Sequence, residues 1–386
     1  MSKNAYFTGQ PIFSQLINLI PRPIIEESVI DSDSDRYYKH FKSMDHLVTM
    51  MYCIFHKCTS IREVVTGMQV CGKKLAHVHL KHLPRRTTLS DANRRRNQDF
   101  FESVYRKLYS RYSQFLSDSR KIKTLADRLF IVDSTTISLF KEILKNAGRT
   151  PANGKRKGGA KVHTLINAGQ DVPCLVKIKA AASHDVTFLK EIKLPPGSIL
   201  VFDKGYIDYA QYQRLKQEMV DWVTRLKEKA CYEVVTQRVV EDKEVEKGVR
   251  SDQVIILGNT SNKPTTRVKA RLIEYHDDQS GKLFSFITSN MRMNASTIAL
   301  IYKKRWQIET LFKRLKQNYP LQYFLGDNEN AIKIQIWCAL IADLLVKVIK
   351  AGLKRSWSFS NLTSMIRIHL MTYIDILKFL EDPDNY

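Results

Sequence analysis

Leu129-Phe-Ile-Val-Asp-Ser-Thr-Thr-Ile-Ser-Leu-Phe140 is the stretch that decides the fold. It is rich in β-branched and apolar residues and has no helical period, so it predicts a buried strand. Ser198-Ile-Leu-Val-Phe-Asp203 has the same character and predicts a second core strand. Each strand carries one acid, Asp133 or Asp203. Because an unpaired carboxylate among apolar side chains is costly, both acids are candidates for a functional site.

Strands and helices alternate around these two segments. The hydrophobic pattern predicts further strands at 161–166, 172–178 and 222–226, and helices at 183–192 and 207–219. The resulting order, βββαβαβ, predicts a mixed α/β sheet flanked by helices. Residues 229–290 then contain four segments of strand character without an intervening helical pattern. They predict a β-rich insertion.

Helical periodicity dominates both ends of the chain, over residues 1–120 and again from Asn294 onward. A basic segment, 77–86, ends in Leu-Pro-Arg-Arg and connects predicted helices of the N-terminal part. This part is a candidate DNA-docking domain of helix-turn-helix or similar type. A helical bundle with incidental charge explains the same pattern equally well.

Charge indicates the kind of partner. The 386 residues include 62 lysines and arginines against 39 acids, a formal net charge of +23. Such an excess favours a polyanionic partner. Basic residues are densest at 81–96, 141–161 and 303–316, so they are spread along the chain rather than gathered in one tail. That distribution favours an extended nucleic-acid path.

Several other classes of protein are disfavoured. No stretch is long enough to span a membrane and the N-terminus has no apolar signal core, so we expect a cytoplasmic protein without a membrane partner. Six scattered cysteines do not form a disulfide framework in a chain of this size. A zinc site is disfavoured because no paired C-x-x-C spacing occurs among its candidate ligands, which are Cys53, His56, Cys58 and Cys71, followed by His77, His79 and His82.

One segment near the C-terminal third combines an acid with basic and aromatic residues: Ile301-Tyr-Lys-Lys-Arg-Trp-Gln-Ile-Glu-Thr-Leu-Phe-Lys-Arg-Leu-Lys316. On a helix its polar members fall within an arc of roughly 60°, which makes one continuous stripe of Tyr302, Arg305, Glu309 and Lys316. Trp306 and Lys313 border that stripe. The apolar members, expected to face a core, are Leu300, Ile301, Ile308, Leu311, Phe312 and Leu315.

Two interpretations of this stripe compete. Arg305 with Glu309, and Glu309 with Lys313, are i,i+4 pairs of the kind found on many solvated helices. Alternatively, Glu309 meets other carboxylates in space, and the cations and aromatic rings bind a phosphodiester backbone. The second interpretation requires acids elsewhere in the chain.

Asp133 and Asp203 could supply those acids. Two strand acids and a helix acid can share a pair of divalent cations, which activate water and stabilise the leaving oxygen in phosphoryl displacement. Mg²⁺ suits such a site because it needs few protein carboxylates. Taken singly, Asp133 could instead cap the Ser134 or Thr135 amides, and Asp203 could be a turn acid before Gly205.

The chain resembles the bacterial DDE transposases of the insertion-sequence four family. Their last acid lies in a pattern written Y-(2)-R-(3)-E-(6)-K, which Tyr302, Arg305, Glu309 and Lys316 match at every spacing. Ile-Val-Asp133-Ser-Thr and Val-Phe-Asp203-Lys-Gly-Tyr-Ile-Asp look like the first two acidic motifs of that family. The resemblance covers roughly residues 85–350.

The resemblance implies a ribonuclease-H-like core in which Asp133, Asp203 and Glu309 are catalytic and hold two Mg²⁺ ions, with Mn²⁺ as a substitute. Members of the family cut transposon ends, in many cases through a DNA hairpin, and join the 3′ ends to target DNA. It also implies that Tyr302, Arg305 and Lys316 grip phosphates and that Trp306 supports a flipped base, which agrees with the stacking chemistry of aromatic rings.

Two assignments stay open. His163 lies on the strand after that of Asp133 and either approaches the DNA site or is a core histidine. The hairpin step in this family also uses an aromatic residue of the β insertion. Four positions are candidates for it: Tyr232, Tyr275, Phe284 and Phe286.

These expectations divide the chain into five parts: a helical DNA-binding domain at 1–120, the first part of the ribonuclease-H-like core at 121–228, the β-rich insertion at 229–290, the catalytic helix at 291–325 and a helical C-terminal region at 326–386. The expected partners are the double-stranded DNA of the terminal inverted repeats and the target, in the bacterial cytoplasm and at the nucleoid. Competing functions are a metal-dependent nuclease or resolvase and a catalytically inactive DNA-binding repressor.

A homodimer is expected in the DNA complex, because two element ends must be cut together. The predicted C-terminal helices carry an apolar stripe that could serve as its interface, formed by Ile332, Ile336, Leu340, Leu344 and Val348. Packing of this stripe within the chain is the alternative.

Overall fold

The computed structural model describes residues 9–78, 80, 82–117, 125–138, 159–180, 186–258 and 267–385. It divides the chain into two compact units. Unit 1 consists of Met1–Arg120, Ile137–Ala160 and Phe312–Tyr386, and unit 2 of Lys121–Thr136 and Lys161–Leu311. No helix in the described part of the chain is long and apolar enough to cross a membrane.

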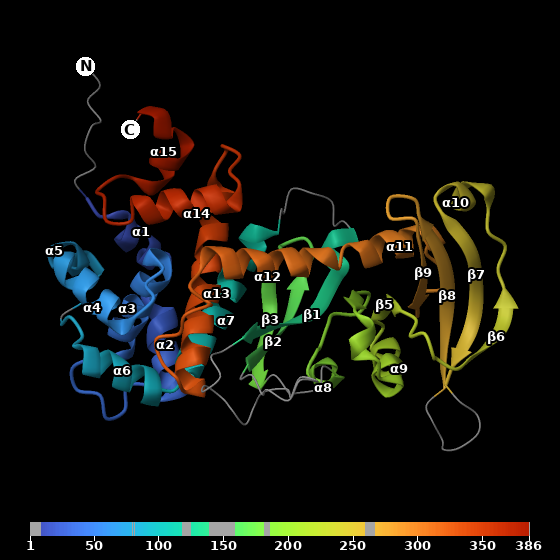
Figure 1. Ribbon diagram of the computed structural model, residues 1–386, viewed down its shortest axis with the longest axis horizontal. Coiled ribbons are helices and arrows are strands. Elements are labelled where there is room, and N and C mark those ends of the chain that lie inside the picture. Colours follow the sequence, from blue (N-terminus) through green and yellow to red (C-terminus); the bar gives the residue numbers. More distant parts are fainter. Residues whose placement is uncertain are drawn as a thin grey trace, which may run out of the picture. The chain divides into compact units, whose positions relative to one another are not determined.

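The described strands form one sheet of nine, in the order β3-β2-β1-β4-β5-β9-β8-β7-β6 (Figure 1). Their bounds are β1 Leu129–Ser138, β2 Gly159–Asn167, β3 Val172–Ala180, β4 Ile199–Phe202, β5 Asp221–Arg225, β6 Tyr232–Gln237, β7 Val249–Leu257, β8 Val268–Asp277 and β9 Lys282–Thr288. Strands β1, β4 and β5 run parallel, whereas β5, β9, β8, β7 and β6 pair antiparallel in succession. The predicted mixed sheet is confirmed.

The register of β1 and β4 positions the two strand acids. Val132 pairs with Phe202 across the parallel ladder. Asp133 and Asp203 are therefore the next residues on neighbouring strands that run in the same direction. The residues that precede the two acids on these strands, Val132 and Phe202, are fully buried in the core together with Trp222 of β5. The parallel pairing thus brings two carboxylates, 70 residues apart in sequence, to neighbouring positions on two central strands.

Four short helices lie wholly in unit 2: α8 Val186–Leu189, α9 Tyr209–Gln217, α10 Asp242–Glu246 and α11 Ala295–Lys303. Of these, α9, α10 and α11 contact strands of the sheet. Helix α9 begins where the Asp208 carboxylate accepts hydrogen bonds from Ala210 N and Gln211 N. Tyr212 of α9 stacks on Trp222 of β5 at 4.4 Å between ring centroids. The predicted order βββαβαβ is confirmed, and α10 is an addition to the insertion, which was expected to be all β.

The segment 301–316 differs from its prediction as one continuous helix. Helix α11 ends at Lys303 and α12, Trp306–Asn318, begins after a turn at Lys304 and Arg305. In that turn Lys304 N donates to Ile301 O at 3.1 Å and Arg305 N to Tyr302 O at 3.0 Å, so the chain tightens to i,i+3 bonding. Most of the predicted apolar face is buried. Leu300 is the exception: it is 57% exposed.

Apart from the strand ends at 137–138 and 159–160, the regular elements in the described part of unit 1 are helices. Its helices are α1 Ile12–Asn18, α2 Arg22–Ser32, α3 Ser43–His56, α4 Ile61–Val70, α5 Gly72–Leu75, α6 Arg86–Arg95, α7 Asp99–Leu116, α13 Glu329–Gly352, α14 Phe359–Ile368 and α15 Ile376–Glu381, with the C-terminal part of α12. Helix α13 packs against α3, α6 and α7. Its predicted apolar stripe is buried: Ile332, Ile336, Leu340, Leu344 and Val348 are at most 8% exposed. Packing within the chain therefore accounts for this stripe.

These elements confirm the fold class, a mixed α/β sheet with a β-rich insertion plus helical N-terminal and C-terminal regions. The insertion strands β6 to β9 extend the same sheet beyond β5, as Figure 1 shows in yellow and orange. Helix α11 contacts β5, β7, β8 and β9. The insertion is therefore joined both to the core sheet and to the helix that leads to Glu309.

Candidate active site

Asp133 is the most deeply buried of the three predicted acids, with 19% of its side chain exposed. Its Oδ1 accepts a hydrogen bond from Ser134 N at 2.7 Å, the backbone contact expected of a strand acid. Its Oδ2 accepts from Arg305 Nη1 at 2.8 Å. Burial raises the pKa of Asp133 to about 6, although Ser134 and Arg305 oppose the rise. A carboxyl group that ionises near neutral pH is typical of functional sites.

Asp203 lies beside it at the end of β4. The Tyr302 hydroxyl donates to Asp203 Oδ1 at 3.2 Å, and Arg225 Nη2 of β5 lies 3.6 Å from the same oxygen. Burial raises the pKa of Tyr302 to about 12, so the phenol keeps its proton and remains a donor. Asp203 thus receives one neutral and one cationic partner.

Glu309 completes the group through Arg305. Arg305 Nη2 donates to Glu309 Oε1 at 2.6 Å while its Nη1 binds Asp133. Burial alone would lower the pKa of Arg305, but Tyr302, Asp133 and Glu309 raise it. The i,i+4 pair considered as a surface feature is therefore present, and it is also part of a larger cluster. The negative charges of Asp203 and Glu309 both act to raise the pKa of Asp133, which places the three acids in one electrostatic field.

The same residues lie inside a recognised domain. A profile of the transposase DDE domain matches residues 124–345, more than half of the chain. The chain belongs to this family. The predicted resemblance to bacterial insertion-sequence transposases is confirmed by relatives of that description.

Three curated relatives of this transposase agree in their descriptions. The candidate transposase y4zB of Sinorhizobium fredii is 30% identical over 69% of this chain and 71% of its own length. The candidate transposase of insertion sequence element IS4SA of Synechocystis is 29% identical over 68% and 71%. The probable transposase of element IS5377 of Geobacillus stearothermophilus is 26% identical over 57% and 56%.

Two further matches say less about what the chain does. Residues 8–81 match a domain of unknown function, DUF4372, so a second family covers the N-terminal helices. A piggyBac transposase synaptic complex with hairpin DNA aligns with 98% of this chain and 80% of that chain, at 12% identity and a TM-score of 0.40. A likeness at that level carries no argument about this transposase.

Trp306 and Lys316 share helix α12 with Glu309. Trp306 opens the helix, and its side chain is 65% exposed, the state required of a ring that stacks on a base. Lys316 follows Glu309 by about 10 Å along the helix axis at 1.5 Å per residue. It is partly buried, which lowers the pKa of its ammonium.

His163 lies elsewhere, in the interior. It is fully buried on β2, and its ring stacks on Phe188 at 5.3 Å between centroids. A DNA contact by this side chain would require the surrounding core to open, so the geometry favours the alternative reading as a core histidine. Of the four insertion aromatics, Tyr275 and Phe286 are buried, Tyr232 is 41% exposed and Phe284 is half-buried.

Arg225 was not predicted from the sequence. It ends β5, next to the strand of Asp203, and its guanidinium lies over the Tyr302 ring at 5.9 Å as well as near the Asp203 carboxylate. The signal for it was present in Asp-Trp-Val-Thr-Arg225, a strand that ends in a cation one crossover after an acidic strand end. Register between β4 and β5 was needed to see that the two ends meet.

The donor set fits a hard divalent cation, since three carboxylates supply only oxygen ligands. In the described residues no three histidine, cysteine or acidic side chains converge closely enough to hold a metal as they stand. Arg305 binds both Asp133 and Glu309. Metal binding by these acids would therefore require the guanidinium to give up at least one of its two partners.

Proposed function

We propose that this DDE transposase cleaves DNA at terminal inverted repeats and joins the freed 3′ ends to target DNA with two divalent cations held by Asp133, Asp203 and Glu309. The observation that carries the proposal is the double contact of Arg305, because it ties the helix acid to a strand acid next to Asp203. When bound, the cations supply water activation and charge stabilisation at the phosphodiester.

The chain's own residues divide the remaining work. Arg305 and Arg225 would bind phosphate oxygens once the acids engage cations, since a planar guanidinium matches phosphate geometry. Tyr302 keeps its proton and orients Asp203 through the 3.2 Å hydrogen bond. In cleavage, water attacks phosphorus and the bond to the 3′ oxygen breaks. In joining, that 3′ hydroxyl loses its proton and attacks the phosphorus of a target phosphodiester. The target's own bond between phosphorus and the 3′ oxygen breaks, and a target 3′ hydroxyl is the leaving group.

A direct assay tests this function. Labelled terminal-repeat DNA, supercoiled target plasmid and Mg²⁺ or Mn²⁺ should give nicked ends and end-to-plasmid products with the purified protein. Asp133→Asn, Asp203→Asn and Glu309→Gln should each abolish both products. Asp278→Asn, at an acid whose side chain is 77% exposed, is the matched control and should retain activity.

The other outcomes identify the competing functions. Cleavage without any covalent joining to plasmid would indicate a nuclease or resolvase. Sequence-specific binding without cleavage in either metal would indicate a repressor. Full activity in all three acid variants would contradict the proposed site.

A hairpin intermediate is part of the proposal. The exposed indole of Trp306 would support an unstacked base beside the cut, and Tyr232 or Phe284 would supply the second ring, since both keep exposed surface. Trp306→Ala should reduce hairpin product on denaturing gels more than Trp306→Phe, because phenylalanine preserves stacking. Equal yields from both variants would contradict this role.

We also propose that two copies act together on two DNA ends. Because the α13 stripe is buried within unit 1, the interface must use other surfaces. Light scattering of the complex with terminal-repeat DNA should give two chains for two ends. One chain for two ends would contradict the dimer.

A further inference from the structure

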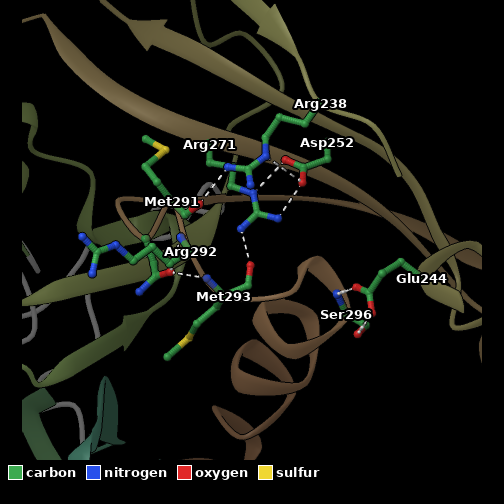
Figure 2. Close-up of polar contacts among 9 residues, drawn as sticks. Arg238, Glu244, Asp252, Arg271, Met291, Arg292, Met293 and Ser296 are labelled. Carbon is green, nitrogen blue, oxygen red and sulfur yellow. Dashed lines mark hydrogen bonds and ion pairs between the residues drawn. The ribbon is translucent and has the colours of Figure 1, made fainter. Parts of the chain in front are cut away.

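The β insertion holds the loop that leads into α11 with two arginines (Figure 2). Arg271 of β8 makes two parallel contacts with Asp252 of β7, Nε to Oδ1 at 2.7 Å and Nη2 to Oδ2 at 2.5 Å. Both side chains are almost fully buried, at 3% and 6% exposed. The remaining guanidinium nitrogen of Arg271, Nη1, donates to Met293 O. Arg238 Nη1 donates to Met291 O at 2.8 Å. Both carbonyls lie just before α11.

A second contact fixes the first turn of α11. Its N-cap residue, Asn294, makes no side-chain capping bond. Glu244 of α10 takes over that function, accepting from Ser296 N at 2.7 Å and from Ser296 Oγ at 2.8 Å. Partial burial opposes the effect, but the Ser296 bonds and Lys247 lower the pKa of Glu244. Because the cap comes from the insertion, the position of α11 depends on the insertion.

A third contact fixes the last turn. Asp277, at the end of β8, binds Lys303 Nζ at 2.5 Å. The Phe286 ring of β9 lies 4.9 Å from that of Tyr302. Tyr302 and Lys303 end α11, and Arg305 follows in the tightened turn. The insertion thus contacts α11 before its start, in its first turn and in its last turn.

We infer that the β insertion is a clamp that sets the position of the Tyr302–Arg305 turn, with Asp252, Arg271 and Glu244 as positioning residues for the catalytic acids. Buried, bidentate ion pairs add little net stability but restrict geometry strongly. Helix α11 is about 13 Å long at 1.5 Å per residue. Because such a short helix moves as a rigid body, a shift at its N-terminus also shifts Arg305, which follows its C-terminus. The expected effect of the clamp on DNA cleavage rests on the proposed function, whereas its effect on the position of the Tyr302–Arg305 turn does not.

Glu244→Ala is the primary test because it removes the cap without leaving a buried charge unpaired. Single-turnover cleavage at saturating DNA should fall by about 10- to 100-fold, the loss expected from misplacing a catalytic group by about 1 Å. The Kd for terminal-repeat DNA should stay within about two-fold of the original. Glu244→Gln, which retains a carbonyl acceptor, should restore most of the rate.

Glu233→Ala is the matched control. Glu233 of β6 and Arg267, the residue that precedes β8, form an ion pair at 2.6 Å. This pair lies within the insertion and joins neighbouring parts of it to each other rather than to α11. Its removal should leave the cleavage rate unchanged. Asp252→Asn should behave like Glu244→Ala, and thermal melting verifies that both variants remain folded.

A readout independent of activity separates this inference from the proposed function. With 5-fluorotryptophan at the four tryptophans, the ¹⁹F resonance of Trp306, assigned through Trp306→Phe, should shift or broaden in Glu244→Ala and remain in place in Glu233→Ala. Unchanged Trp306 resonance and unchanged cleavage in Glu244→Ala would overturn the clamp. A loss of DNA affinity equal to the loss of cleavage would also overturn it, in favour of a DNA-binding insertion. If the original protein does not cleave DNA, the resonance still tests the clamp while the proposed function fails.

Discussion

Asp133 is held in an environment that opposes its own charge. Burial raises its pKa to about 6 from an ordinary value of 3.8, even with Arg305 and the Ser134 amide beside it. The folded chain therefore binds a proton at this position more tightly than the unfolded chain. The associated stability is fully present below pH 3.8 and is lost as the pH rises through about 6. At neutral pH the charge of Asp133 costs folding free energy.

Asp133→Asn should therefore stabilise the metal-free protein at pH 7.5. The neutral amide mimics the protonated acid, so a gain of about 1–3 kcal/mol is expected for a shift of this size. Thermal melting in EDTA at pH 7.5 and pH 4 measures it, with Asp278→Asn as the exposed control. Most of the gain should disappear at pH 4, because this pH lies well below the folded-state pKa of about 6 and close to the ordinary value of 3.8. A lower melting temperature at pH 7.5 would contradict the assignment.

Divalent cations should make the original protein more stable than Asp133→Asn, the reverse of the order expected in EDTA. If Asp133, Asp203 and Glu309 hold cations, Mg²⁺ or Mn²⁺ added at a hundred-fold excess over Kd stabilises the original protein by about 2.7 kcal/mol. Asp133→Asn loses a ligand and should show a much smaller increase in melting temperature. Because metal and proton compete for the same carboxylate, the increase should also fall as the pH drops below about 6. An equal increase in both proteins would place the metal elsewhere.

At the scale of elements, sequence patterns predicted what depends on local periodicity. The strands of Asp133 and Asp203 were predictable because apolar, β-branched runs each carry a single acid. The break between α11 and α12 was not, since one tightened turn at Lys304 and Arg305 leaves the spacing of Tyr302, Arg305 and Glu309 close to that of a continuous helix.

Contacts between distant elements were also beyond the sequence patterns. Glu244 caps a helix that begins 51 residues later, with its partner Ser296 at a separation of 52. Arg225 meets Asp203 only because β4 and β5 are neighbours in the sheet. An isolated glutamate or arginine in a sequence carries no signal of such a partner, since many pairings are sterically open until the register is known.

Helix α13 gives a prediction that separates packing within the chain from an interface. Leu344 is fully buried in unit 1, so Leu344→Ala should lower the free energy of unfolding by roughly 2–5 kcal/mol. Ile368→Ala, at a side chain 68% exposed on α14, should change it by less than about 0.5 kcal/mol. Urea denaturation measures both. Light scattering should give the same mass for all three proteins, whereas a change in mass with Leu344→Ala alone would indicate an interface.

At the scale of the whole molecule, the net charge of +23 bears on how the transposase finds DNA. Exposed cations gather on α6, where Arg94 and Arg95 in the last turn face solvent. Arg96 belongs to the interior instead, because it lies over the Tyr38 ring at 4.2 Å and is 1% exposed. The predicted basic segment 81–96 is thus divided between a solvent-facing group and a structural arginine. Only the first is available to phosphates.

Replacement of the exposed pair, Arg94→Gln with Arg95→Gln, should weaken DNA binding uniformly across sequences. In a plot of the logarithm of the DNA association constant against the logarithm of the salt concentration, each phosphate contact adds about −0.9 to the slope. Loss of the two arginines should therefore make the slope less negative by about 1 to 2. Arg36→Gln is the matched control, since Arg36 is equally basic but is paired with Asp33 at 3.3 Å on another surface segment. Fluorescence anisotropy with terminal-repeat and unrelated duplexes from about 50 to 200 mM salt measures the slopes. An unchanged slope in the double variant would exclude α6 from the DNA path, and a loss confined to the terminal-repeat duplex would assign these arginines to base recognition rather than to phosphates.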